Sequence, residues 1–182
     1  MHIGHNSNSD FRGYGGRLVA WRKARHALLP KALPIEVIRR RVARAAALGL
    51  DYKAYASLRA ATGRDIIALL FSTNALGMLR EARLPSDRAA FLDRLEAGRF
   101  AAVQGGLDPS QVAAVPQIDG ARIAPRFMQS WSSMSDQLLA DLRAWKAPTD
   151  GTLIIGTTAF EREWCAAARA AGYVSAERYF GI

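Results

Sequence analysis

The sequence has little from which to build a covalent, metal or histidine-dependent site. Its 182 residues contain one cysteine, Cys165, and three histidines, all within the first 26 residues. A single cysteine excludes a disulfide within the chain and a cysteine-rich zinc site. No stretch approaches the roughly 18 to 20 apolar residues of a membrane-spanning helix, and residues 1–16 lack the apolar core of a signal peptide. We therefore expect a cytoplasmic protein with no metal site and no cofactor.

Charge is distributed unevenly along the chain. The formal net charge is +9, and residues 1–65 contain 13 basic and four acidic side chains, whereas residues 66–182 contain 12 of each. The N-terminal third is therefore expected to attract phosphate groups or another anionic surface. Most of its basic side chains are arginines, whose planar guanidinium suits paired contacts with phosphate oxygens. A basic segment that packs on an acidic neighbour is the alternative interpretation.

Composition and hydrophobic spacing divide the chain into three parts. Residues 1–16 are rich in Gly, Asn and Ser and predict a flexible leader. Residues 17–63 predict a basic helical region, which begins with a helix over about 16–29 that Trp21 anchors in the core. Residues 64–182 predict a small α/β body. The expected fold is therefore α/β or α-rich mixed, with the basic helices ahead of the body.

The clearest helix follows Pro34, over residues 35–48, and its two faces differ. Arginines lie on one face, and an apolar stripe expected to face the core lies on the other: Ile35, Ile38, Val42, Ala45 and Ala46. A second helix is expected over residues 52–62. Asp51 is a candidate N-cap for it, and Gly63 is a candidate for ending it.

The junction of these helices carries a nucleic-acid hypothesis. Ala45 and Gly49 stand four residues apart, with leucines on either side, and this spacing resembles a helix-turn-helix unit. The resemblance implies that the second helix reads bases while arginines bind phosphates. The candidate nucleic-acid-binding residues are Arg39, Arg40, Arg41, Arg44, Tyr52, Lys53, Ser57 and Arg59. Against this, the second helix is alanine-rich and offers few groups that could hydrogen-bond to base edges.

The α/β body is predicted from short apolar runs and periodic segments. Residues 65–73 predict a buried strand, although residues 65–80 could instead form one buried helix. The other predicted elements are strands over 100–106 and 152–155, helices over 86–98, 134–145 and 159–171, a surface connection over 107–127 with a short helix after Asp108, and a short extended C-terminal ending.

Polar loops after the predicted strands carry an alternative, ligand-binding hypothesis. In open α/β sheets, ligands gather at the carboxyl ends of strands, where small loops and helix N-termini offer donors to anions. The candidate ligand-binding residues are Ser72, Thr73, Asn74, Gly156, Thr157 and Thr158, and Gln104, Gly105 and Gly106 form a similar loop. No GxxxxGK[ST], GxGxxG or GxSxG motif occurs. Glu161 and Glu163 flank Arg162, a pattern typical of a solvated helix face, and Cys165 is expected to be a buried, inert thiol.

The sequence thus favours a non-enzymatic nucleic-acid-binding protein, either a DNA-binding regulator or an accessory factor of a nucleoprotein complex. It assigns no catalytic residue. The first alternative is a small α/β enzyme that acts on a phosphorylated or otherwise anionic ligand at the loops after the strands. The second alternative is an interaction module whose basic face binds an acidic protein partner.

Overall fold

The computed structural model describes residues 33–181. The leader predicted over residues 1–16 and the helix predicted over residues 16–29 lie outside the described residues. The chain divides into two compact units, residues 1–38 and 39–182. The boundary falls within helix α2 (Ile35–Ala47), and every strand belongs to the second unit. In the described part of the chain, no helix combines the length and the apolar character needed to cross a membrane.

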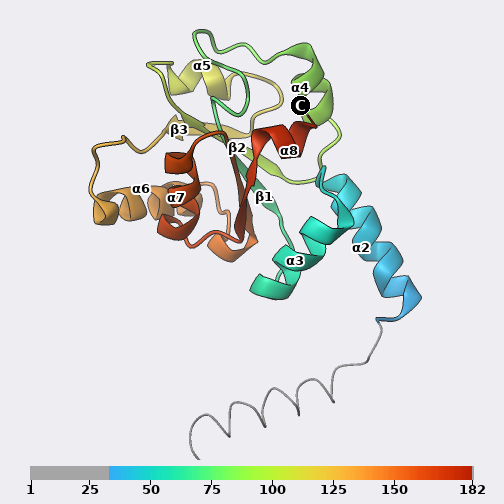
Figure 1. The fold of residues 1–182 in the computed structure, drawn as a ribbon. Coiled ribbons are helices and arrows are strands. Elements are labelled where there is room, and N and C mark those ends of the chain that lie inside the picture. The colour runs from blue at the N-terminus through green and yellow to red at the C-terminus, as the bar shows by residue number, and fades with distance from the viewer. Residues whose placement is uncertain (1–32, 182) are drawn as a thin grey trace, which may run out of the picture. The chain divides into compact units, whose positions relative to one another are not determined.

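Within residues 33–181, five strands form one parallel sheet in the order β3-β2-β1-β4-β5 (Figure 1). The strands are β1 (Ala68–Ser72), β2 (Gly98–Val103), β3 (Gly120–Ile123), β4 (Thr152–Gly156) and β5 (Gly172–Ser175). The other described helices are α3 (Tyr52–Thr62), α4 (Ser86–Leu92), α5 (Pro109–Ala113), α6 (Trp131–Ala144), the 3-10 turn η1 (Thr149–Gly151), α7 (Ala159–Ala167) and α8 (Ala176–Phe180). The predicted mixed α/β fold is therefore confirmed.

Alternating side chains of the central strand supply two cores, one on each face of the sheet. Leu69 and Phe71 of β1 belong to a buried cluster with residues of α3, α4, α5 and α8. Ala68 and Leu70, which point the opposite way, belong to a second cluster with residues of α6 and α7. Both faces of the sheet are covered, and for this reason the central strands β1 and β4 are buried along their whole length.

The direction in which the strands are added reverses once. The chain passes from β1 to β2 and β3 through α4 and α5, then crosses to the other side of β1 and adds β4 and β5 through α6 and α7. The two helix pairs pack on opposite faces of the sheet, α4 and α5 in one core cluster and α6 and α7 in the other, as right-handed crossovers in opposite directions require. The reversal lies between β1 and β4. In such doubly wound sheets the carboxyl ends of the strands around this point leave a crevice for ligands.

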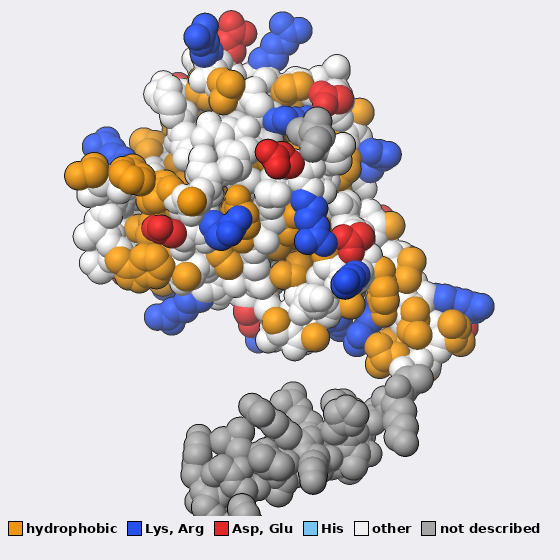
Figure 2. Space-filling view, viewed as in Figure 1, with side chains coloured by type: hydrophobic (Ala, Val, Ile, Leu, Met, Phe, Trp, Pro, Cys, Tyr) orange, Lys and Arg blue, Asp and Glu red, His pale blue; other side chains and the backbone are white. Residues whose placement is uncertain are grey.

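The two helices before the sheet begin and end as predicted. Asp51 caps α3 by accepting a hydrogen bond from the Ala54 N–H at 2.7 Å, and Gly63 ends it in the left-handed region at φ 74°. The predicted core stripe of α2 is wrong over most of its length, because Ile35 is 59% and Val42 47% exposed and only Ala45 is buried. Figure 2 shows apolar side chains on the surface of this helix.

The prediction of a strand over residues 65–73 is confirmed by β1, and three neighbouring predictions need correction. The helix expected to run to Gly98 ends at Leu92, and Gly98 instead begins β2. A Cβ at Gly98 would lie 3.0 Å from the Phe100 ring, so this glycine serves packing within the sheet. The surface connection over 107–127 contains the edge strand β3, and the extended ending contains the helix α8.

Candidate functional site

The structure places Arg44 and Arg59, two of the predicted nucleic-acid-binding residues, against Asp65. Arg44 Nε donates to Asp65 Oδ2 at 2.9 Å, and its two terminal nitrogens donate to backbone carbonyls at 2.8 and 2.9 Å. The Tyr55 hydroxyl also donates to Asp65 at 2.8 Å, and Arg59 Nη1 lies 3.7 Å from the same carboxylate. Burial and this hydrogen bond raise the pKa of Tyr55. The arrangement fastens α2 and α3 to the start of β1.

The other basic candidates differ in exposure. Arg39, Arg40 and Lys53 are exposed, and Arg41 is half-buried. Tyr52 is half-buried as well, and the Ser57 hydroxyl donates back to the Lys53 carbonyl at 2.9 Å. The exposed cations therefore lie on α2 and at the start of α3, in the second unit of the chain.

The turn between α2 and α3 packs closely against Phe91 of α4. Gly49 has φ +68°, and a Cβ at this position would lie 2.6 Å from the Phe91 ring, next to Leu95. Glycine is needed here because the chain turns in the left-handed region and because Phe91 of α4 approaches closely. The glycine that suggested a helix-turn-helix thus contributes to the contact with α4.

The loops named as candidate ligand-binding residues do meet, at the carboxyl edge between β1 and β4. Ser72 and Thr73 at the end of β1 are fully buried. Ser72 Oγ accepts from the Ala75 N–H at 3.0 Å, and Thr73 Oγ1 accepts from the Gln104 N–H at 3.0 Å. Both hydroxyls therefore shape the loops after β1 and β2.

A buried carboxylate occupies the point where the strand order reverses. Glu161 of α7 is fully buried, which corrects the expectation of a solvated helix face. Its Oε2 accepts hydrogen bonds from the N–H groups of Thr157 and Thr158, and its Oε1 accepts from Asn74 Nδ2 at 3.0 Å. Glu161 therefore takes the donors that an external anion would need at the N-terminus of α7.

Two features of the sequence explain this arrangement. Thr158 and Glu161 form a capping box, in which the Thr158 hydroxyl accepts from the Glu161 N–H at 3.2 Å. The spacing of Thr and Glu three residues apart is the signal that could have located the buried carboxylate. Gly156 completes the fit, because a Cβ there would lie 2.7 Å from Glu161 Oε2 and 2.9 Å from the Tyr173 ring.

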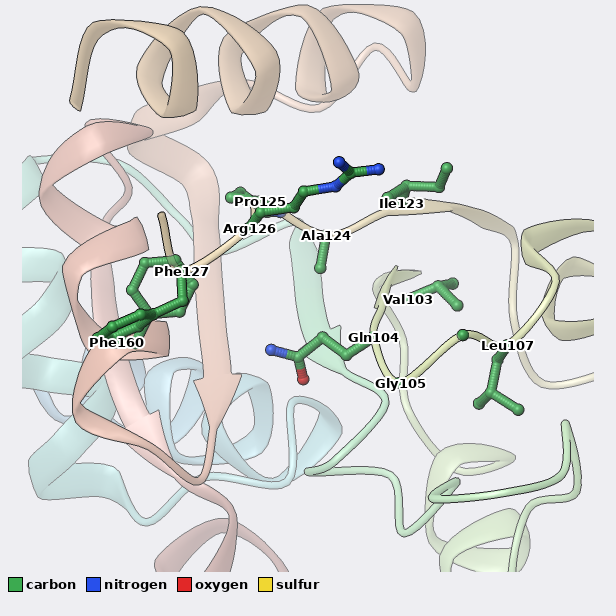
Figure 3. Close-up of a pocket in the computed structure, with 11 residues that line it drawn as sticks. Val103, Gln104, Gly105, Leu107, Ile123, Ala124, Pro125, Arg126, Phe127 and Phe160 are labelled. Atoms are coloured by element: carbon green, nitrogen blue, oxygen red, sulfur yellow. The ribbon is translucent and has the colours of Figure 1, made fainter. Parts of the chain in front are cut away.

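A cavity of about 480 Å³ opens at the same edge, at the ends of β2 and β3 (Figure 3). The loop of Gln104, Gly105 and Gly106 forms the wall after β2. The segment after β3 contributes Arg126 and Phe127, and Phe160 comes from the start of α7. The cavity thus lies beside the Glu161 cluster, displaced from the strand reversal toward β3.

Gln104 is the polar side chain at the centre of this cavity. Figure 3 shows its amide extending from the end of β2, with the nitrogen directed toward Phe160. Its Oε1 is buried and has no hydrogen-bond partner among the described residues. A buried acceptor without a partner costs about 1–3 kcal/mol. Gly105 and Gly106 follow with φ of 70° and 79°, which turns the chain sharply at the rim.

The chemistry of the cavity suits binding more than proton transfer. Of the described residues that line it, Gln104 and Arg126 are the ones with polar side-chain groups, and none supplies a carboxylate, thiol or imidazole. Cys165 lies on α7 outside the lining, and burial raises the pKa of its thiol, which keeps it protonated at neutral pH. Residues 33–181 contain no cluster of three or more His, Cys, Asp or Glu placed to hold a metal ion.

Comparison with known proteins gives no match: no family model fits this chain, and no curated protein or solved structure is significantly similar to it. The geometry of the carboxyl edge and the distribution of charge are therefore the grounds on which function can be inferred.

Proposed function

We propose that this protein binds a small anionic molecule in the cavity beside Gln104, Gly105 and Gly106. The observation that carries the proposal is the cavity itself, at the carboxyl ends of β2 and β3, with Gln104 and Arg126 as the polar side chains of its lining. This edge is where doubly wound sheets bind ligands. A volume of about 480 Å³ is within the usual range for small-molecule sites.

The charge and backbone of the rim favour an anion. Arg126 is exposed at the rim, and Figure 3 shows its side chain extending along the segment that carries Ala124 and Ile123. Gly105 and Gly106 allow a ligand to approach the backbone closely, because they carry no side chain. A guanidinium together with backbone N–H groups is a common environment for phosphate and carboxylate groups.

The proposal is tested by isothermal titration with pyrophosphate, ribose 5-phosphate and mononucleotides at low salt. We expect at least one of them to bind, and Arg126→Ala to weaken that binding about tenfold, as for loss of a charge-assisted hydrogen bond. Arg143→Ala, which removes an exposed arginine near the end of α6, is the matched control and should leave the affinity unchanged. Absence of binding by every compound, or equal loss in both variants, would contradict the proposal.

A second candidate is nucleic-acid binding through the basic surface of α2 and α3. The observation that favours it is the exposure of Arg40 and Lys53, next to the half-buried Arg41. Arg44 and Arg59 would contribute less than the sequence suggested, because Asp65 holds them against the protein. Phosphate contacts of this kind would position a nucleic acid without reading its sequence.

Fluorescence anisotropy with duplex DNA, single-stranded DNA and RNA across a salt series tests this second candidate. Each lost phosphate contact should reduce the salt slope by about one. We expect the double variant Arg40→Glu/Arg41→Glu to lose binding. The control variant Arg143→Glu/Lys146→Glu makes the same change in net charge at the end of α6, and it should retain most of the nucleic-acid binding. No binding at low salt, or equal loss in both variants, would rule out a specific role for this surface.

A further inference from the structure

Two aromatic rings stand at the mouth of the cavity. Phe127 is 77% exposed, and its ring meets that of Phe160 edge to face with centroids 5.4 Å apart. Phe160 in turn contacts the buried Trp164 edge to face at 6.0 Å, so its position is fixed by the core of the protein. The Phe160 ring therefore packs against the core, whereas the Phe127 ring remains largely exposed to water. A flat apolar group that entered here would cover Phe127 and displace water from it.

The rest of the lining divides into an apolar part and a polar part. Val103, Leu107 and Ile123 supply aliphatic surface, which suits the body of a ring. Gln104 supplies a primary amide, which has a donor and an acceptor side by side. Such an amide pairs with two adjacent groups on the edge of a heterocycle, as with N6 and N7 of adenine. Gln104 Oε1 is buried and unpartnered among the described residues, and rotation of the amide would turn it toward the cavity, where a base has a donor for it and an inorganic anion has none.

We infer that the ligand of this cavity is a mononucleotide, an inference that rests on the proposed anion-binding function. Its base packs against Phe127 and Phe160 with one edge toward the amide of Gln104. Its phosphate lies at the rim, near Arg126 and the backbone of Gly105 and Gly106. Rotation of the Gln104 amide about its last bond, which has a low barrier, exchanges donor and acceptor and lets the same side chain meet different base edges.

The surface around the mouth of the cavity is apolar, which favours a ligand with a large apolar part. Figure 2 shows apolar side chains over the loop before α6 and over α7. This loop contains Met128, which is 91% exposed but lies outside the cavity lining. Phe127 and Met128 are thus neighbouring exposed apolar residues, and Phe127 lines the cavity whereas Met128 does not. Substitution of Met128 is therefore a control for the effect of removing an exposed apolar side chain that does not line the cavity.

Isothermal titration with AMP, GMP, CMP and UMP, beside adenosine and ribose 5-phosphate, tests the inference. We expect at least one mononucleotide to bind about tenfold or more tightly than ribose 5-phosphate, because stacking and edge contacts add to the phosphate contact. Phe127→Ala should weaken mononucleotide binding about fivefold or more and leave ribose 5-phosphate unaffected. Met128→Ala should change neither. Gln104→Leu, which removes both amide atoms, should reduce the discrimination among bases.

The outcomes separate this inference from the proposed function. Equal affinity for ribose 5-phosphate and all mononucleotides overturns the inference and leaves anion binding in place. Equal affinity for adenosine and AMP overturns it as well, because the phosphate would then make no contact. No binding by any phosphate-bearing compound overturns both. Circular dichroism of each variant checks the fold, which a change at the exposed Phe127 is expected to leave intact.

Discussion

The buried carboxylate of Glu161 gives the sharpest test of the structure at the strand reversal. Glu161→Ala leaves the Thr157 and Thr158 N–H groups and Asn74 Nδ2 without their shared acceptor. A hydrogen bond to a charged group contributes about 1.5–3 kcal/mol. Thr157 and Thr158 are exposed, so water can replace part of the loss. We therefore expect the free energy of unfolding to fall by about 2–4 kcal/mol, less than the sum of the three bonds.

The measurement is urea unfolding followed by circular dichroism and tryptophan fluorescence. Glu161→Gln should lower the free energy of unfolding less than Glu161→Ala. The glutamine oxygen can still accept from the two N–H groups, and rotation of the Asn74 amide lets the Asn74 oxygen accept from the glutamine nitrogen. Glu163→Ala changes an exposed carboxylate two residues away on α7 and should stay within about 0.5 kcal/mol of the unmodified protein. If Glu161→Ala were as stable as Glu163→Ala, the carboxylate would not hold this edge of the sheet together.

Three further predictions concern stability measured by the same method. Gly49→Ala should destabilise the protein by about 1–3 kcal/mol more than Gly63→Ala, because both positions have positive φ but a Cβ clashes with α4 only at Gly49; equal costs would contradict the contact. Asp51→Ala should cost about 1 kcal/mol as a lost N-cap, and since the Ala54 N–H lowers the pKa of Asp51, this difference should shrink as the pH falls through that pKa. Burial raises the pKa of Asp141, so this side chain contributes most to the free energy of unfolding below its ordinary pKa, and the contribution is lost as the pH rises. Asp141→Asn should therefore stabilise the protein more at pH 7 than at pH 3. The opposite order would refute this reasoning.

Local signals predicted much of the fold. Asp51 and Gly63 marked the ends of α3, and the apolar runs marked β1 and β4, because capping and burial leave a pattern within a few residues. The edge strand β3 is only Gly120–Ile123 and its last residues are exposed, so it carries no apolar run to recognise. The strand order follows from packing between distant elements, which no short pattern records.

The candidate site was predictable in part. The polar loops after β1, β2 and β4 were located, because strands of a parallel sheet end at one edge. Glu161 was missed although the capping box with Thr158 was present, because an acidic residue beside Arg162 is more often solvated. Phe127 and Phe160 are 33 positions apart in the sequence, and only the fold brings their rings together. Likewise, only the fold shows that Asp65 holds Arg44.

The central claim is that the cavity beside Gln104 is the binding site, and NMR titration tests it most directly. Amide spectra of the ¹⁵N-labelled protein would be recorded with increasing concentrations of AMP, GMP, CMP, UMP and ribose 5-phosphate, each in its own titration. We expect the shifts to concentrate at Gly105, Gly106, Phe127 and the side-chain amide of Gln104, and to spare α2. Shifts centred on the arginines of α2, or no shifts with any of these compounds at millimolar concentration, would contradict the claim.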